Sequence, residues 1–145
     1  MNNLINRIEI PVRFSENDPM GVVWHGNYIK YFEDGREAFG LQYNISYMDY
    51  FNNSILAPIV KIYCDYKRSL RFGDTAVIET EYEYSESAKL IFNYKIFDKK
   101  SELLCASGRT IQVFTDIKGN LILTHPEFFE KWKVTWGFPG SHYND

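Results

Sequence analysis

The clearest helical pattern in this chain lies in residues 27–42, which read NYIKYFEDGREAFGLQ. Six residues spaced by three and four positions fall near one face of such a helix: Tyr28, Tyr31, Phe32, Gly35, Phe39 and Gln42. The opposite face is charged, with Lys30, Glu33, Asp34 and Glu37. Asn27 is a suitable N-cap, and Gly40 lies near the end. The pattern predicts one long amphipathic helix.

On either side of this helix, apolar residues alternate with polar ones, which is the period of a half-buried strand. A short run covers residues 4–13, and longer runs cover 60–67, 78–84, 90–96 and 103–115. Breakers rich in Gly, Ser and Asp separate the long runs, which favours antiparallel hairpins. A turn is expected at 117–120 and a short helix at 126–132. The predicted fold class is α+β, with the long helix packed on one face of the sheet.

Length and composition restrict the function. The chain has 145 residues, which favours one domain over 1–145. Its 16 Lys and Arg against 19 Asp and Glu give a net charge of -3, which does not fit a nucleic-acid-binding surface. No stretch approaches the ~20 apolar residues of a membrane span, so no membrane insertion is expected. The first ten residues lack the apolar core of a signal peptide, so a cytoplasmic location is expected.

No cofactor or metal is expected. The chain has no P-loop and no dinucleotide-binding glycine motif. His25, His125 and His142 lack the spacing of zinc ligands. Cys64 and Cys105 lie in strand-like runs and are expected to be reduced, buried side chains.

The loop over residues 14–26 carries the candidate chemistry. Asp18-Pro19-Met20-Gly21 has the residues of a type I turn. Asp18 is therefore either a turn former or a catalytic carboxylate, held just before a helix N-terminus where free N–H groups would stabilise an anionic intermediate. His25 also has two interpretations: it is either a loop histidine bonded to the backbone or a group that orients substrate.

Charged residues on the strands have simpler interpretations. Lys67, Arg68 and Arg71 form a small basic cluster at a strand end. The cluster is either a solvated rim or a contact for a ligand phosphate. The acidic row 79–83 is expected to face solvent, with Lys95 opposite.

The segment 14–28, FSENDPMGVVWHGNY, resembles the signature of the hotdog-fold 4-hydroxybenzoyl-CoA thioesterase family. Segments 31–37, 66–74 and 107–110 continue the resemblance in the same order. It implies a hotdog fold, in which an antiparallel sheet of about five strands wraps around one central helix. It also implies homo-oligomers, as dimers joined edge to edge and often paired into tetramers, with active sites at the subunit interface.

The same resemblance assigns roles to residues. The family's catalytic carboxylate falls on Asp18 and its signature histidine on His25. The helix N-terminus that polarises the thioester carbonyl falls on Gly26, Asn27 and Tyr28. Phe14 stands where related short-chain thioesterases often have Tyr, so a hydroxyl that would place water or substrate is missing.

Thioester hydrolysis requires few groups, because the leaving thiolate has a conjugate acid with a pKa of ~8.5 and no strong general acid is needed. Asp18 would act as general base or as nucleophile through an anhydride. The expected activity is hydrolysis of a short-chain, medium-chain or aryl acyl-CoA, or of an acyl-carrier-protein thioester. Two alternatives remain: an acyl-thioester dehydratase or hydratase of the same fold, and a non-catalytic acyl-CoA-binding protein.

Overall fold

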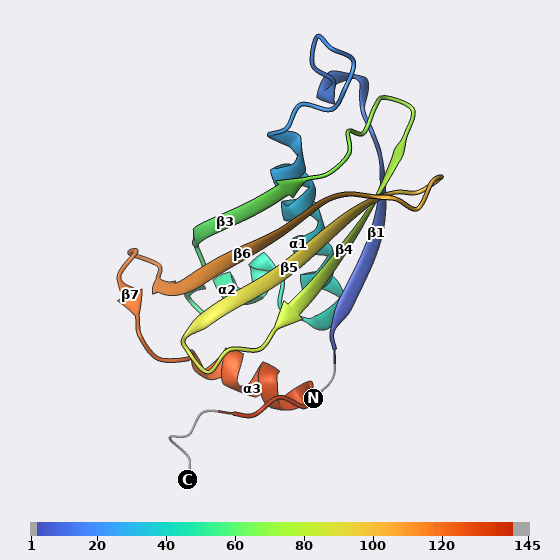
Figure 1. The fold of residues 1–145 in the computed structure, drawn as a ribbon. Coiled ribbons are helices and arrows are strands. Elements are labelled where there is room, and N and C mark those ends of the chain that lie inside the picture. The colour runs from blue at the N-terminus through green and yellow to red at the C-terminus, as the bar shows by residue number, and fades with distance from the viewer. Residues whose placement is uncertain (1–2, 141–145) are drawn as a thin grey trace.

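The computed structural model describes residues 3–140, and one long helix lies against one face of an antiparallel sheet (Figure 1). In chain order the elements are β1 (Ile5–Pro11), the single 3-10 turn η1 (Phe14–Glu16), α1 (Asn27–Tyr43), α2 (Tyr47–Asn52), β2 (Ile55–Leu56), β3 (Ile59–Tyr66), β4 (Thr75–Glu83), β5 (Lys89–Asp98), β6 (Leu104–Asp116), β7 (Leu121–Ile122) and α3 (Glu127–Thr135). His142 lies outside the described residues. The predicted long helix is therefore confirmed.

The main sheet has five antiparallel strands in the order β1-β4-β5-β6-β3. The short strands β2 and β7 pair with the far end of β6. This is the hotdog arrangement that the family resemblance implies, and the α+β fold class is confirmed. Lys95 pairs with Glu79 in the register of β4 and β5, as expected for the outer face.

The core lies between α1 and the sheet. Buried and half-buried residues alternate along β4, and the fully covered ones, such as Ile78 and Thr80, face the helix. Two glycines allow this close approach: a Cβ on Gly35 of α1 would collide with Ile78 and Thr80, and one on Gly108 of β6 would collide with the ring of Phe32. Close packing of helix on sheet therefore depends on small residues at both surfaces.

Three local predictions need correction. Gln42 is exposed and not part of the buried helix face; its Oε1 accepts a bond of 2.7 Å from Asn6 Nδ2 at the edge of the sheet. Asn27 is the first helical residue, and Gly26 is the N-cap. The short helix α2 was not predicted, because six residues are too few to show a period. The terminal helix is confirmed, although it runs on to Thr135.

The C-terminal end of α1 is closed by polar contacts. Ile45 N–H donates to the Gly40 carbonyl at 2.9 Å, next to Asn44 in the left-handed conformation. The Tyr43 carbonyl accepts bonds from the indole N–H groups of Trp132 at 2.7 Å and Trp136 at 3.1 Å. The orphan carbonyl of the last turn is thus satisfied by residues of α3 and the turn after it.

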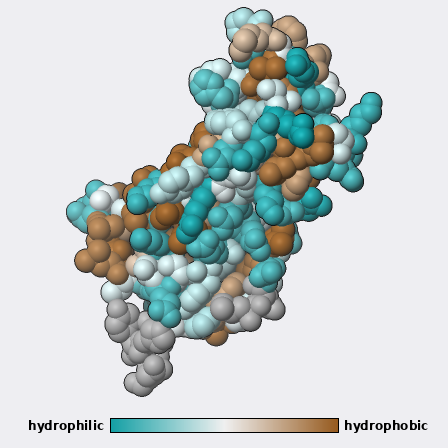
Figure 2. Space-filling model, viewed as in Figure 1, coloured by the Kyte–Doolittle hydropathy of each residue, from teal (hydrophilic) through white to brown (hydrophobic). Residues whose placement is uncertain are grey.

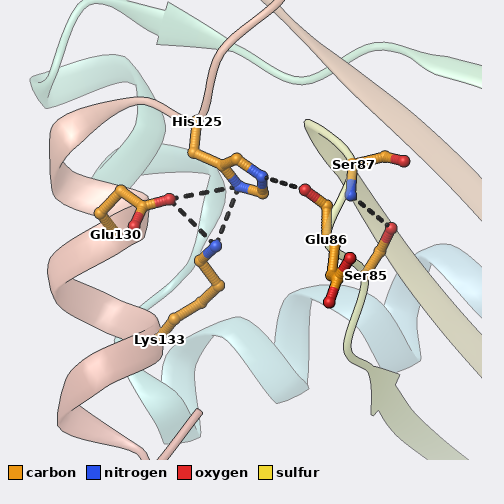
Figure 3. A network of polar contacts seen from close by, with 6 residues as sticks. All are labelled: Ser85, Glu86, Ser87, His125, Glu130 and Lys133. Atoms are coloured by element: carbon orange, nitrogen blue, oxygen red, sulfur yellow. Dashed lines mark hydrogen bonds and ion pairs between the residues drawn. The ribbon is translucent and has the colours of Figure 1, made fainter. Parts of the chain in front are cut away.

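A buried polar network attaches α3 to the turn between β4 and β5 (Figure 3). His125 Nε2 donates to the Glu86 carbonyl at 2.8 Å, so its other ring nitrogen can accept from Lys133 Nζ at 3.0 Å. Lys133 is only 1% exposed, and its Nζ lies 3.0 Å from Glu130 Oε1. His125 therefore has a structural role. No group of three or more metal-ligating side chains is found within residues 3–140.

One edge strand of the main sheet is β3, which pairs with β6 on one side. Its apolar row is uncovered, because Val60 is 53% exposed, Ile62 43% and Tyr66 48%. Figure 2 shows hydrophobic residues along this edge and around β7, beside a largely hydrophilic outer sheet face. Such an edge offers backbone groups and apolar surface to another strand.

Candidate active site

The loop before α1 and the loop after β3 lie together at the end of the sheet where α1 begins (Figure 1). Val23 N–H donates to the Leu70 carbonyl at 2.8 Å, and Leu70 N–H donates to the Tyr28 hydroxyl at 3.1 Å. Burial raises the pKa of Tyr28, so this hydroxyl stays protonated while it accepts that bond. The two loops therefore form one surface around the helix start.

Asp18 occupies the predicted turn. Gly21 N–H donates to the Asp18 carbonyl at 3.0 Å, and Gly21 has a φ of 81°, which favours glycine. Asp18 Oδ1 accepts bonds from the N–H groups of Met20 at 2.8 Å and Val22 at 3.3 Å. Within residues 3–140, Oδ2 has no hydrogen-bond partner. One oxygen thus stabilises the turn, and the other is available for chemistry.

His25 is exposed, and its surroundings are aromatic. Its ring centroid lies 4.9 Å from that of Trp24 and 6.3 Å from that of Tyr66. The Tyr66 hydroxyl donates to the His25 carbonyl at 2.9 Å, which fixes the backbone immediately before α1. Burial, aided by a hydrogen bond to Cys64, raises the pKa of Tyr66 to about 12, so this donor stays protonated at neutral pH.

The helix N-terminus offers fewer free donors than the sequence predicts. Asn27 N–H donates to the Trp24 carbonyl at 2.9 Å, and Tyr28 N–H donates to the His25 carbonyl at 3.3 Å. In the described part of the chain, the N–H group of Gly26 has no acceptor. A Cβ on Gly26 would collide with the ring of Trp24, so glycine at this position lets the ring lie over the backbone. Gly26 is therefore the candidate oxyanion donor.

Glu16 organises this loop, and sequence reasoning missed it. Its carbonyl accepts bonds from Trp24 N–H and from the Asn27 side chain, both at 2.9 Å. Its carboxylate accepts from Arg13 N–H at 2.7 Å and from the Tyr31 hydroxyl at 3.0 Å. Burial and the Glu16 charge raise the pKa of Tyr31. The family signature begins with an acid two residues before the Asp, which was the available signal.

The predicted basic cluster lies in the loop after β3. Lys67, Arg68 and Arg71 are all exposed in the loop after β3. The Arg71 guanidinium reaches the turn of Asp18, because its Nη1 lies 4.0 Å from an ideal Cβ on Gly21. No ion pair is found for any of the three among the described residues, so all remain available to an anionic group.

Phe14 lies on the outer side of the same surface. It is 76% exposed, and its ring meets that of Phe72 edge to face, with the centroids 5.6 Å apart. Both loops thus contribute an exposed aromatic ring. This position carries no hydroxyl, and the ring points to solvent rather than into the core.

A cavity of about 710 Å³ opens at the other end of α1. It lies between the second half of that helix, α2, β2 and the ends of β5 and β6, and it contains no residue of the 14–28 loop. Within one chain the cavity is therefore separate from Asp18. The catalytic assignment rests on the loop, because it holds an available carboxylate and an available backbone donor.

Comparison with known proteins identifies the family. The model of the thioesterase-like superfamily matches residues 12–133. "Putative acyl-CoA thioesterase YneP" of Bacillus subtilis is 36% identical over 99 residues, which cover 68% of this chain and 72% of that protein. The chain belongs to the thioesterase-like superfamily. Another relative, the acyl-CoA thioesterase YbgC of Haemophilus influenzae, is 28% identical over 76% of this chain and 81% of its own length.

Solved structures agree with this thioesterase-like assignment. The DHNA-CoA thioesterase of Staphylococcus aureus superposes with a TM-score of 0.79 at 28% identity, covering 94% of this chain and 89% of that one. The hotdog fold of this member of the thioesterase-like superfamily is thereby confirmed. No helix in residues 3–140 is long and apolar enough to cross a membrane.

Proposed function

We propose that this protein is an acyl-CoA thioesterase that hydrolyses a short-chain, medium-chain or aryl acyl-CoA to the free acid and CoA. One observation carries the proposal: among the residues that the structure describes, a single short loop holds a carboxylate oxygen without a partner, on Asp18, and a backbone N–H without a partner, on Gly26. Thioesterase names among the relatives support it. Such a pair of groups could bind a thioester carbonyl through the N–H and activate a water molecule through the carboxylate.

In this mechanism the Gly26 N–H donates to the thioester carbonyl oxygen and stabilises the negative charge that develops there. Asp18 Oδ2 accepts a proton from water as the water oxygen attacks the carbonyl carbon. The C–S bond then breaks, and the thiolate of CoA leaves and takes up the proton. In the second route, Asp18 attacks directly and water hydrolyses the resulting anhydride. In either route His25 positions the thioester, and Asn27 and Tyr28 hold the helix start in place.

The CoA portion carries phosphates, which need positive charge. Lys67, Arg68 and Arg71 lie on the loop beside the Asp18 turn, and Arg71 reaches furthest toward it. We assign these residues to the phosphates of CoA, where guanidinium groups form charge-assisted bonds. An acyl-carrier protein would present one phosphate in its thiol-bearing arm, so the same residues would suit it.

The uncovered β3 edge supports a homodimer. Antiparallel pairing of two β3 edges would extend the sheet and cover Val60, Ile62 and Tyr66. In this pairing the end of β3 at Tyr66, beside His25, would lie opposite the start of β3 at Ile59 of a second copy. The cavity of that second copy opens at the start of its β3. Each thioester site would then face the cavity of the other copy. Pairing of such dimers would give a tetramer, and we place this single-domain enzyme in the cytoplasm.

The experiment is release of free thiol from acetyl-, hexanoyl-, palmitoyl- and benzoyl-CoA by wild type and by Asp18→Asn. Asparagine keeps the acceptor for Met20 N–H, so the turn should persist while the base is lost. We expect a loss of about 10²-fold or more in kcat, the range for a positioned acid or base. Asp116→Asn is the matched control, because Asp116 Oδ1 holds a similar turn by bonds of 2.9 Å to Lys118 and Asn120 N–H.

Equal kcat values for Asp18→Asn and an active wild type would make Asp18 a turn former and refute the mechanism. If wild type hydrolyses none of the four esters, acyl-carrier-protein thioesters are tested next. Saturable binding without any turnover would favour the acyl-CoA-binding alternative.

A further inference from the structure

The cavity at the C-terminal half of α1 is mainly apolar. Its walls come from α1, the segment 45–58 and the facing ends of β5 and β6. The apolar lining side chains include Ile45, Tyr47, Ile55, Leu56, Leu90 and Phe92. A volume of about 710 Å³ is within the range of ligand sites and exceeds what one aromatic ring fills.

Two residues of this lining each carry a buried polar atom that has no hydrogen-bond partner among the described residues. The Tyr50 hydroxyl is one, on a residue that is 6% exposed, and Gln112 Oε1 is the other, on a residue that is 5% exposed. Gln112 Nε2 donates to the Ala57 carbonyl at 2.6 Å, which fixes the orientation of the amide and leaves Oε1 as an acceptor. Buried polar atoms are normally paired, so both require an explanation.

Arg36 of α1 adds a positively charged group to the cavity lining. Its Nη1 lies 3.4 Å from the Tyr94 hydroxyl, which forms a shorter contact of 2.6 Å with Thr110 Oγ1. Arg36 forms no ion pair within residues 3–140. Burial raises the pKa of Tyr50 well above its usual value, although the Arg36 charge opposes this, so the Tyr50 hydroxyl stays protonated and can donate.

The balance of these groups specifies the ligand chemistry. Arg36 and Tyr50 offer N–H and O–H donors, whereas Gln112 offers an acceptor. An ammonium would be repelled by Arg36. A carboxylate would meet Gln112 Oε1 and the nearby carboxylate of Glu37, which also lines the cavity. A hydroxyl both donates and accepts, and it carries no charge, so it suits all three groups.

We propose that this cavity, which in the proposed homodimer would face the Asp18 loop of the second copy, binds the acyl group of a thioester held at that loop, and that Arg36, Tyr50 and Gln112 select a medium-chain aliphatic acyl group that carries a hydroxyl. The proposal rests on the proposed thioesterase function, since it names the acyl group of the same reaction. The aliphatic chain fills the apolar walls, and its hydroxyl pairs the two buried atoms that otherwise lack partners.

The test compares kcat/KM for hexanoyl-, octanoyl- and decanoyl-CoA with the value for each matching ester hydroxylated at its terminal carbon. At one chain length or more, wild type should prefer the hydroxylated ester by about tenfold, as two or three hydrogen bonds would give. Tyr50→Phe should reduce that preference severalfold, because it should lower kcat/KM for the hydroxylated ester more than kcat/KM for the plain ester. Its melting temperature should not fall, because the deleted hydroxyl has no hydrogen-bond partner among the described residues.

Tyr82→Phe is the matched control. The Tyr82 hydroxyl is also buried and unpartnered among the described residues, but Tyr82 packs against Trp132 and Phe138 and does not line the cavity. It should keep the wild-type preference. Equal kcat/KM for every pair in wild type would overturn the proposal, as would equal effects of Tyr50→Phe and Tyr82→Phe. A preference for 4-hydroxybenzoyl- over benzoyl-CoA without one in the aliphatic series would overturn the aliphatic assignment.

If no thioester is hydrolysed, the proposed function fails but the cavity can still be tested. The melting temperature of wild type and Tyr50→Phe is then measured with octanoic acid and with 8-hydroxyoctanoic acid. Greater stabilisation by the hydroxy acid, lost in Tyr50→Phe, would support the hydroxyl site. Equal stabilisation by both acids would refute it.

Discussion

At its N-terminal end α1 leaves the Gly26 N–H without an acceptor in the described chain, whereas at its C-terminal end the Tyr43 carbonyl accepts two indole N–H groups. Both ends of a helix carry unpaired backbone groups by construction. Here one end is satisfied by distant side chains and the other is kept open by the 14–26 loop. The difference separates the part of the helix that contributes stability from the part that is available for chemistry.

The glycines at the two ends show the same division. A Cβ on Gly26 would meet the ring of Trp24, which is 49% exposed and has room to move. A Cβ on Gly40 would lie 2.6 Å from Ser46 Cα and 2.7 Å from the Ile45 carbonyl oxygen, and this backbone cannot move alone. One added methyl group therefore has opposite consequences at the two ends.

Of the two glycine substitutions, Gly26→Ala should have the larger effect, and that effect should be on activity. The displaced Trp24 ring packs against His25, so the loop and the Gly26 N–H would shift relative to the thioester. A misplacement of about 1 Å can cost about 10²-fold in rate, and we expect a loss of kcat of that order. The free energy of unfolding measured in urea should change by about 0.5 kcal/mol or less, because the collision is at a half-exposed side chain. A fully active Gly26→Ala would remove the N-terminal end of α1 from the mechanism.

Gly40→Ala should affect stability instead. Overpacking a close backbone contact costs about 1–3 kcal/mol. The urea midpoint should therefore fall, while the slope of the unfolding free energy against urea concentration stays constant. Activity per folded molecule should equal that of wild type. If Gly40→Ala lowered kcat while it remained folded, the two ends of the helix would not be independent.

Tyr66→Phe should have the smallest effect of the three substitutions, and that effect is on how folding stability depends on pH. Burial and the contact with Cys64 raise the pKa of Tyr66 to about 12 in the folded chain, against about 10 when unfolded. The unfolded state therefore loses its proton first, and folding loses stability as pH rises from about 10 to about 12. Because Tyr66 is 48% exposed, this loss is small. Stability curves from pH 9 to 12 should be slightly flatter for Tyr66→Phe, and parallel curves would contradict the assignment.

Periodicity predicted the long helix and the five main strands, because the pattern in each repeats over seven or more positions. The same pattern misplaced Gln42, since a residue at the margin of a helix face can turn to a strand residue such as Asn6. The uncovered apolar row of β3 was predicted as strand, but sequence alone does not show which strand ends at the edge. α2 was too short to be detected.

The candidate site was predicted as residue types but not as a hydrogen-bond pattern. The Asp-Pro-Met-Gly turn and His25 are local features, and the turn forms as expected. By contrast, the N–H groups of Asn27 and Tyr28 each donate to a carbonyl three residues back, which depends on the exact loop conformation. The cavity residues Arg36, Tyr50 and Gln112 come from three separate elements, so no sequence spacing could have grouped them.

The three tryptophans of the chain give each end of α1 its own optical reporter. Trp24 lies beside His25 at the N-terminal end, and Trp132 and Trp136 both donate to Tyr43 at the C-terminal end. Indole emission follows the polarity around the ring, so ligand entry at the thioester site should change the signal of Trp24, while unfolding should change all three. Trp24→Phe would therefore silence the binding signal and leave the unfolding signal, without any added label.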